Sequence, residues 1–225
     1  MKIVFAILLA FCLSIVHAQD CTSLAPMKEG VELEYTSYNK KGKDVGGMRL
    51  SVKEASANSA VLASELINQK GKVEGNFEYE VKCENGVFYV DMSMFFDSQQ
   101  LQGFENMEME MTSKYLEFPT GAKAGDKLPD GSVEAKVMSG DIKIMTISMQ
   151  ITDHTVEARE SITTPAGTFD CLKTSYSYNS KFGFIKVSGS ATNWMAEDIG
   201  SVRSESFDKK GNSAGSQELT MLKGN

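Results

Sequence analysis

The sequence predicts a mainly β protein, built as an antiparallel barrel or half-barrel of about nine to eleven strands with one short helix near residues 93–106. The main observation is a period of two. The segments 31–36, 48–53 and 77–84 alternate apolar with polar residues, which is typical of strands that have one buried and one solvated face. Two further observations are the number of such segments and a turn sequence that occurs three times.

The repeated turn occupies residues 38–46, 67–75 and 207–215. Each copy has an apolar residue, Asn or Asp, one further residue, Lys-Gly, and a second Gly four residues later. Because Asn, Asp and Gly tolerate the positive φ that tight hairpin turns need, each copy predicts a β-hairpin. Asn85-Gly86 and Pro165-Ala166-Gly167 predict two more turns of this kind.

Residues 138–163 predict a long strand with an internal irregularity. Ile142 and Ile144 share one parity, whereas Met145 and Ile147 take the other. Such a slip in phase is what a β-bulge produces, and bulges bend long strands around a barrel. The alternative is that Ile144 is simply an exposed apolar side chain.

The predicted helix is the only stretch with helical spacing of its apolar residues. Residues 107–112 then alternate Met with Glu or Thr, which predicts a return to strand. Residues 116–131 are rich in Gly and Pro, and we expect them to separate two halves of one sheet rather than two domains.

Residues 1–18 have the features of a signal peptide. Lys2 supplies the positive start, residues 3–16 are almost entirely apolar, and Val16-His17-Ala18 resembles a cleavage site. We therefore expect an exported protein, periplasmic or secreted, with a single β-barrel-like domain over residues 19–225. The apolar run is too short for a transmembrane helix, so no transmembrane span is expected. Lipidation of Cys12 is disfavoured, because Phe11 stands where a small residue is expected.

The net charge disfavours some classes of partner, and the cysteine content predicts a disulfide. The formal net charge of −7 argues against nucleic acid and anionic membranes as partners. Outside the signal peptide the chain has Cys21, Cys83 and Cys171, which allows one disulfide and one spare thiol in an oxidising compartment. Cys21–Cys83 is favoured, because an odd number of hairpin crossings returns Cys83 to the end of the sheet where Cys21 enters. Cys21–Cys171 remains open.

Catalytic, metal and cofactor sites are not predicted. Gly211–Gly215 matches the Gly-x-Ser-x-Gly pattern of hydrolases around Ser213, but that mechanism needs a strand-to-helix turn and a downstream His, which the chain lacks. His154 is the only histidine outside the signal peptide and is interpreted as structural. No ligand pair has the close spacing of a zinc site. A hydrolase is therefore the least favoured alternative.

Methionine is the residue type that stands above background, with 13 in the chain. Its flexible, polarizable side chain suits surfaces that adapt to varied apolar ligands. The candidate ligand-binding residues are Met94, Phe95, Phe104, Met107, Met109, Met111, Met145 and Met149. The alternative is that these methionines only fill an irregular core.

Three segments carry a resemblance to a known family: Trp194 with Gly200–Glu205, Thr164–Cys171, and Lys82–Met92. With them the chain resembles the TapB-like exported proteins of Gram-negative bacteria, which are related to a domain-of-unknown-function family. The resemblance implies a barrel-like antiparallel sheet, similar to envelope proteins that hold lipids or assist polysaccharide export, and it implies no established activity. We therefore expect a non-catalytic envelope protein that binds a lipid or another apolar or amphipathic small molecule. The alternative is a structural or assembly protein that docks an envelope protein through its sheet edge or an apolar flap.

Overall fold

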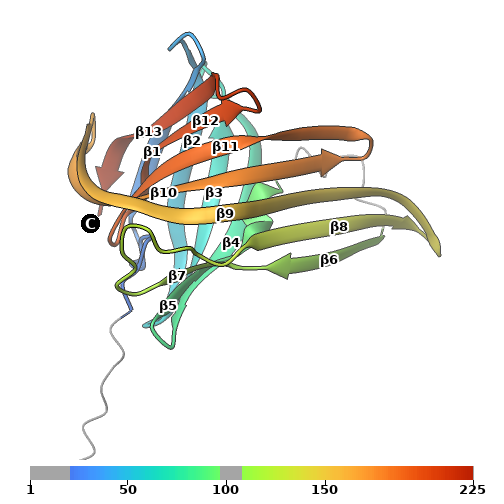
Figure 1. Cartoon of the computed structure of the whole chain (residues 1–225), viewed down its shortest axis with the longest axis horizontal. Helices are drawn as coiled ribbons and strands as arrows, with labels where there is room; N and C mark the ends of the chain where they lie inside the picture. The colour runs from blue at the N-terminus through green and yellow to red at the C-terminus, as the bar shows by residue number, and fades with distance from the viewer. Residues whose placement is uncertain (1–20, 97–107, 225) are drawn as a thin grey trace, which may run out of the picture.

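The computed structural model describes residues 21–96 and 108–224. The predicted signal peptide and residues 97–106 of the predicted helix lie outside these ranges. Within them, thirteen strands form one antiparallel sheet that curves into a nearly closed barrel (Figure 1). The strands are β1 (Glu32–Asn39), β2 (Asp44–Ala55), β3 (Ser59–Ile67), β4 (Val73–Glu84), β5 (Val87–Val90), β6 (Glu108–Lys114), β7 (Leu116–Pro119), β8 (Gly131–Ser139), β9 (Ile142–Thr164), β10 (Gly167–Phe182), β11 (Ile185–Ala196), β12 (Gly200–Asp208) and β13 (Ser213–Lys223).

The barrel closes by a change of partner in one stretch of chain. The sheet order is β6-β8-β9-β10-β11-β12-β13-β1-β2-β3-β4-β5-β7, so β6 and β7 are its two edges. Only Tyr115 separates them in the sequence. Residues 108–119 therefore pair first with β8 and then with β5, which brings the two edges of the sheet together. The fold class is as predicted, and the strand count is higher than the predicted nine to eleven. The four-residue strand β7 is too short to show a full alternation.

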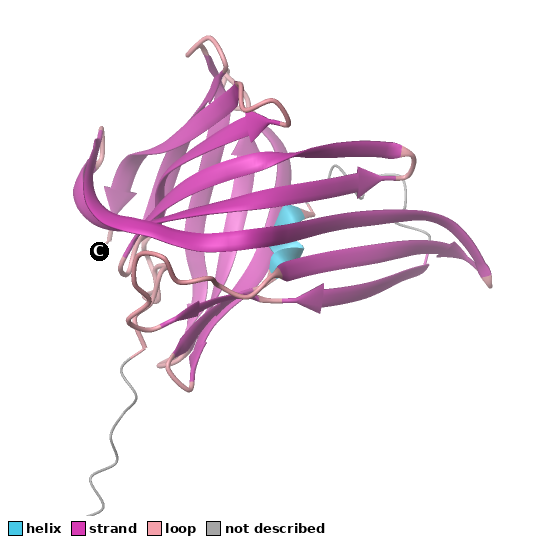
Figure 2. Ribbon diagram, viewed as in Figure 1, coloured by secondary structure: helices cyan, strands magenta, loops and turns pink. Residues whose placement is uncertain are grey.

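A single turn of 3-10 helix, η1 (Met92–Phe95), is the only helical element among the described residues. It packs against β4, β6 and β8, beside the junction of the two edges (cyan in Figure 2). The Asp91 carboxylate fixes its start by accepting hydrogen bonds from the Ser93 backbone N–H at 2.9 Å and from the Ser113 hydroxyl at 3.0 Å. Met92 is fully buried, so η1 fills the interior next to the junction.

The three repeated turns have one structure. In the first, the Asn39 Oδ1 atom accepts the backbone N–H groups of Lys41 and Lys43 at 2.9 and 3.2 Å. Asn68 and Asp208 accept the corresponding groups in the other two copies. The first glycine of each copy has a φ between 71° and 77°, a conformation that an L side chain rarely adopts. The sequence prediction of three hairpins is confirmed.

The second glycine of the turn brings neighbouring hairpins together. In each copy the residue before it is left out of the ladder, so that it forms a β-bulge. A Cβ on Gly46 would lie 2.3 Å from the Ile67 carbonyl oxygen, and one on Gly215 would lie 2.6 Å from that of Tyr38. The β1–β2, β3–β4 and β12–β13 hairpins consequently lie side by side at one end of the barrel, toward the top of Figure 1.

The register of strand β9 shifts at three places: at Ile144, around Asp153 and at Glu157. The register against β8 shifts so that Ile144 has no partner between Lys143 and Met145, which confirms the predicted slip in phase; Ile144 is also exposed. The second bulge is at Asp153, with a φ of 54°, where the register against β10 skips residues. Its effect is to turn the next side chain, His154, into the barrel.

The N-terminal segment is tied to the wall of the barrel by the disulfide. Cys21 and Cys83 are bonded with their Cα atoms 5.7 Å apart, which is the pairing favoured from the sequence. Leu24 and Ala25 are buried behind it. Cys171 is free and buried.

Candidate ligand-binding cavity

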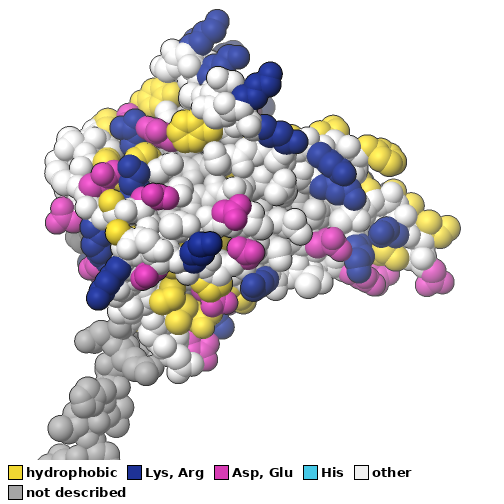
Figure 3. All heavy atoms as spheres, viewed as in Figure 1, with side chains coloured by type: hydrophobic (Ala, Val, Ile, Leu, Met, Phe, Trp, Pro, Cys, Tyr) yellow, Lys and Arg dark blue, Asp and Glu magenta, His cyan; other side chains and the backbone are white. Residues whose placement is uncertain are grey.

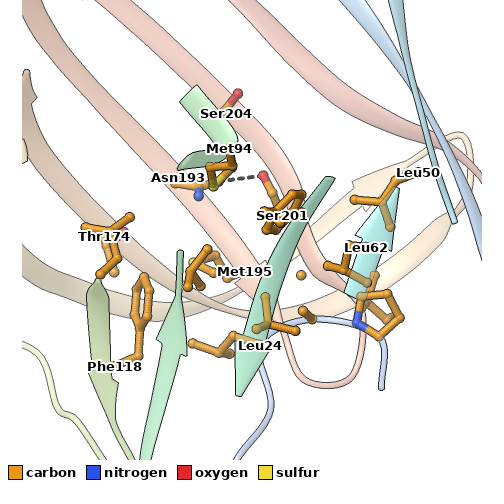
Figure 4. Close-up of a pocket in the computed structure, with 18 of the residues that line it drawn as sticks. Leu24, Leu50, Leu62, Met94, Phe118, Thr174, Asn193, Met195, Ser201 and Ser204 are labelled. Atoms are coloured by element: carbon orange, nitrogen blue, oxygen red, sulfur yellow. Dashed lines mark hydrogen bonds between the residues drawn. The ribbon is translucent and has the colours of Figure 1, made fainter. Parts of the chain in front are cut away.

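The barrel encloses a cavity of about 260 Å³. A second cavity of about 190 Å³ adjoins it, because Phe95, Tyr176 and Ser204 line both. The larger cavity has two walls of different character. Figure 4 shows Leu50 and Leu62 on one side of this space and Thr174 on the other.

The apolar wall comes from the N-terminal half of the chain. Strands β2 to β5 and β7 present alternate residues to the cavity, as expected for a half-buried sheet. The segment after Cys21 adds the side chains of Leu24, Ala25 and Pro26 to this wall. The apolar wall consists of Leu24, Ala25, Pro26, Met48, Leu50, Leu62, Tyr79, Val81, Val90, Leu116 and Phe118, with Tyr35 on β1 beside them.

The polar wall comes from the C-terminal half. Its polar residues are His154, Thr174, Tyr176, Asn193, Ser201, Ser204 and Gln217, contributed by strands β9 to β13, and the same half of the chain adds the apolar side chains of Met195 and Ile199. Some of these groups already have partners: the Ser201 hydroxyl donates to Asn193 Oδ1 at 2.6 Å, the dashed line in Figure 4, and Gln217 Nε2 donates to Ser37 Oγ at 3.1 Å. None of the described residues that line the larger cavity is charged.

His154 is buried deep in the polar wall, with 2% of its surface exposed. Its ring stands edge-on to Phe118 and Tyr176, with centroid distances of 5.3 and 5.6 Å. Neither ring nitrogen has a hydrogen-bond partner among the described residues, and neither does the Thr174 hydroxyl. Burial lowers the pKa of His154 to about 4, although the charge of Asp130 acts in the opposite direction. The imidazole is therefore neutral at neutral pH.

The structure places the candidate ligand-binding residues in different surroundings. Met94 and Phe95, on η1, line the larger cavity, and Met149 lines the second. Met145 is half-buried and lines neither. Met109 and Met111 are exposed on β6, while Phe104 and Met107 lie outside the described residues.

Sequence reasoning did not select the polar wall. Asn193 and Ser204 lie on strands where Ser, Thr and Asn occupy both parities, so the inward face could not be recognised from hydropathy. For Leu50 and Tyr79 the signal was present, because both belong to the inward parity of alternating segments.

The residues considered for catalysis, Ser213 and His154, are not joined into a catalytic group in the described part of the chain. Ser213 is exposed at the end of a hairpin turn, and no hydrogen bond joins His154 to an acid or a nucleophile in the described part of the chain. The described residues contain no cluster of three or more His, Cys, Asp or Glu side chains that could hold a metal ion. Nor do they include a helix long and apolar enough to cross a membrane.

A second feature is the set of exposed apolar side chains at two hairpin tips. The β8–β9 and β10–β11 hairpins project from the barrel, to the right in Figure 1. Their tips expose Ile142, Ile144, Phe182, Phe184, Ile185 and Val187, and Phe184 is fully exposed. Lys143, Lys181 and Lys186 lie among them, with Asp141 in the β8–β9 turn, and Figure 3 shows yellow apolar, dark-blue basic and magenta acidic side chains in this region.

A family model described as DUF3108-like matches residues 28–219. The chain belongs to the DUF3108-like family. Two solved structures share this fold: a presumed exported protein with a YmcC-like fold from Bacteroides fragilis, at 22% identity and a TM-score of 0.75, and a presumed lipoprotein from Parabacteroides distasonis, at 25% identity and a TM-score of 0.73. In both comparisons the match covers 91% of this DUF3108-like chain and 100% of the other chain. No curated protein matches it.

Proposed function

We propose that this DUF3108-like protein is an exported, non-catalytic envelope protein that binds an apolar or amphipathic small molecule in its barrel. The observation that carries the proposal is the cavity of about 260 Å³ between an apolar and an uncharged polar wall. Sites for small molecules in proteins are mostly apolar concave spaces with a few placed polar groups. The cavity has this composition, and the adjoining cavity extends it along β9 to β12.

Export is supported from two directions. The first eighteen residues have the order of charge, apolar run and small residues that a signal peptide needs. The two similar structures are of a presumed exported protein and a presumed lipoprotein. We further propose that the protein is TapB-like, and that after cleavage of the signal peptide the mature chain lies in the periplasm or outside the cell.

The test is to fill the cavity with a larger side chain. Met48 lines the larger cavity and is half-buried, whereas Met221 is similarly half-buried but does not line it. We expect Met48→Trp to weaken binding of the neutral fluorophore N-phenyl-1-naphthylamine about tenfold, since the indole occupies its space. Met221→Trp is the matched control and should bind like the wild type.

Both variants are first checked for the thermal unfolding transition of the wild-type chain. The proposal would be contradicted if the wild type did not bind the fluorophore, or if both variants bound it equally strongly. Native mass spectrometry of the protein purified from the envelope of its host cell adds an independent readout. The wild type is expected to carry a small molecule that Met48→Trp lacks.

A second candidate function is docking of a partner protein, favoured by the exposed hairpin tips. Large exposed apolar patches mark interaction surfaces. Because three lysines (Lys143, Lys181 and Lys186) and one acid (Asp141) lie at the tips, the partner that fits is an envelope protein whose apolar surface is bordered mainly by acidic groups. A photocrosslinker at Phe184 should then capture one discrete protein in cells, and a crosslinker at Val73, exposed at another hairpin, should not. Equal capture from both positions would contradict this function.

A further inference from the structure

The polar wall contains a group of unsatisfied atoms. Buried polar side chains in proteins nearly always have a hydrogen-bond partner, and each exception calls for an explanation. Here Nδ1 and Nε2 of His154 and Oγ1 of Thr174 have none among the described residues, although 2% and 1% of these two side chains are exposed. Both side chains line the larger cavity.

His154 and Thr174 are neighbours on the inner face of strands β9 and β10. Thr174 pairs with Val156, which follows His154 by two residues along β9. Such diagonal neighbours in an antiparallel pair lie roughly 7 Å apart. A single polar group of a bound molecule can therefore meet both side chains.

The bulge at Asp153 is the reason that the imidazole reaches this position. Ile151 faces inward, and without the bulge the next inward residue would be Asp153. The bulge instead makes His154 and Val156 the inward residues, and Asp153 is exposed. The fold thus accepts a residue at positive φ, and the result is an unpaired imidazole inside the barrel.

We propose that His154 and Thr174 form a hydrogen-bonding anchor for an uncharged polar group of the ligand, of the alcohol or carbonyl class, whose apolar body lies against the opposite wall. This inference rests on the proposed function. A neutral imidazole offers one donor and one acceptor, and a threonine hydroxyl offers both. A ligand hydroxyl, which also does both, can bond to Thr174 and to one nitrogen of the imidazole.

Charge decides against a carboxylate or an ammonium group at this point. No Lys, Arg, Asp or Glu is found among the described residues that line the larger cavity. The second cavity includes Glu205, but that carboxylate is already paired with Arg203 at 2.6 Å. An ionised group would lose its hydration without gaining a counter-charge, which is costly in an enclosed site. A neutral hydroxyl or carbonyl group loses much less.

The experiment compares three probes of equal chain length on the full mature chain: 1-dodecanol, dodecanoate and dodecane, each displacing N-phenyl-1-naphthylamine. At pH 7.5 the wild type should bind 1-dodecanol about tenfold more tightly than dodecanoate. The double variant His154→Phe/Thr174→Val should weaken 1-dodecanol by about tenfold and leave dodecane unchanged, because it removes the hydrogen bonds and keeps the shape. His154→Gln, which retains a donor and an acceptor, should keep most of the preference for the alcohol.

The outcomes separate this inference from the proposed function. If neither dodecane nor 1-dodecanol displaces the fluorophore from the wild type, the proposed function fails and the anchor with it. If dodecane binds but 1-dodecanol has the same affinity for the wild type and the double variant, only the anchor is overturned, and ordered water alone satisfies these atoms. Thr174→Val, which keeps the shape of the side chain, provides the same comparison if the double variant does not fold.

Discussion

The Trp194 indole on β11 donates a hydrogen bond from Nε1 to the Glu160 carboxylate on β9, at 2.6 Å. The Lys173 ammonium lies 3.1 Å from the same oxygen and 5.1 Å from the centre of the indole ring. Arg203 on β12 lies 5.8 Å from that centre. The indole is only 7% exposed although it lies on the opposite face of β11 from Asn193 and Met195. These contacts join strands β9 to β12 on the outside of the barrel.

Replacing Glu160 by Gln tests this contact. The hydrogen bonds from Trp194 and Lys173 hold the pKa of Glu160 below its ordinary value of 4.5. A carboxyl group whose pKa is lowered by folding stabilises the protein above its ordinary pKa, and that contribution is lost as the pH falls through the lowered value. We expect Glu160→Gln to lower the free energy of unfolding at pH 7, and the difference from the wild type to shrink as the pH falls below 4.5, as measured by urea unfolding over a series of pH values.

The control for this substitution is Glu197→Gln. Glu197 forms an exposed ion pair with Arg159 at 3.6 Å, and such pairs contribute little. A loss of stability at pH 7 that is the same for both variants would show that the Trp194 contact has no special role.

Reduction of the Cys21–Cys83 disulfide should destabilise the protein. The bond closes a loop between residues 62 positions apart, and restricting such a loop in the unfolded chain typically contributes about 2–4 kcal/mol. We expect urea unfolding with and without reductant to differ by that amount. The variant Cys21→Ala/Cys83→Ala should unfold like the reduced wild type and be insensitive to reductant; a sensitive variant would contradict this account.

Cys171 should be chemically inert in the folded protein. Burial is the main cause that raises the pKa of this thiol to about 11, and Asp170 and Glu160 add to it. Since the thiolate is the reactive form, iodoacetamide at pH 8 should leave Cys171 unlabelled in the native protein and label it in urea. Mass spectrometry gives the readout, and equal labelling in both states would refute the prediction.

Local chemistry explains what the sequence could predict. The Asn85-Gly86 turn, with φ values of 52° and 75°, and the three repeated turns depend on residues adjacent in the chain. The slip around Ile144 is visible for the same reason, because two apolar residues of opposite parity adjoin each other. These features need no knowledge of what the strands pair with.

The remaining features depend on long-range pairing. The change of partner at Tyr115 joins two edges of the sheet, and nothing within residues 108–119 signals it. The inward orientation of His154 follows from the bulge at Asp153, which the sequence shows only as a polar interruption in a strand. The cavity depends on the distance between the two halves of the barrel, and the hydropathy pattern of a single strand carries no information about that distance.

The two glycines of the repeated turn should differ sharply in their tolerance of a side chain. At Gly42 the space around a Cβ is open, and only the φ of 71° opposes alanine. At Gly46 the φ is 113°, and the Cβ would lie 2.3 Å from the Ile67 carbonyl oxygen in the next hairpin. We expect Gly42→Ala to cost about 1 kcal/mol and Gly46→Ala about 3 kcal/mol or more, since backbone strain and a steric clash add. Urea unfolding of both variants measures the difference. As a control, Gly42→Asn should be close to the wild type in stability, because Asn tolerates this φ. Equal losses of stability for Gly42→Ala and Gly46→Ala would mean that the hairpins do not pack against each other as described.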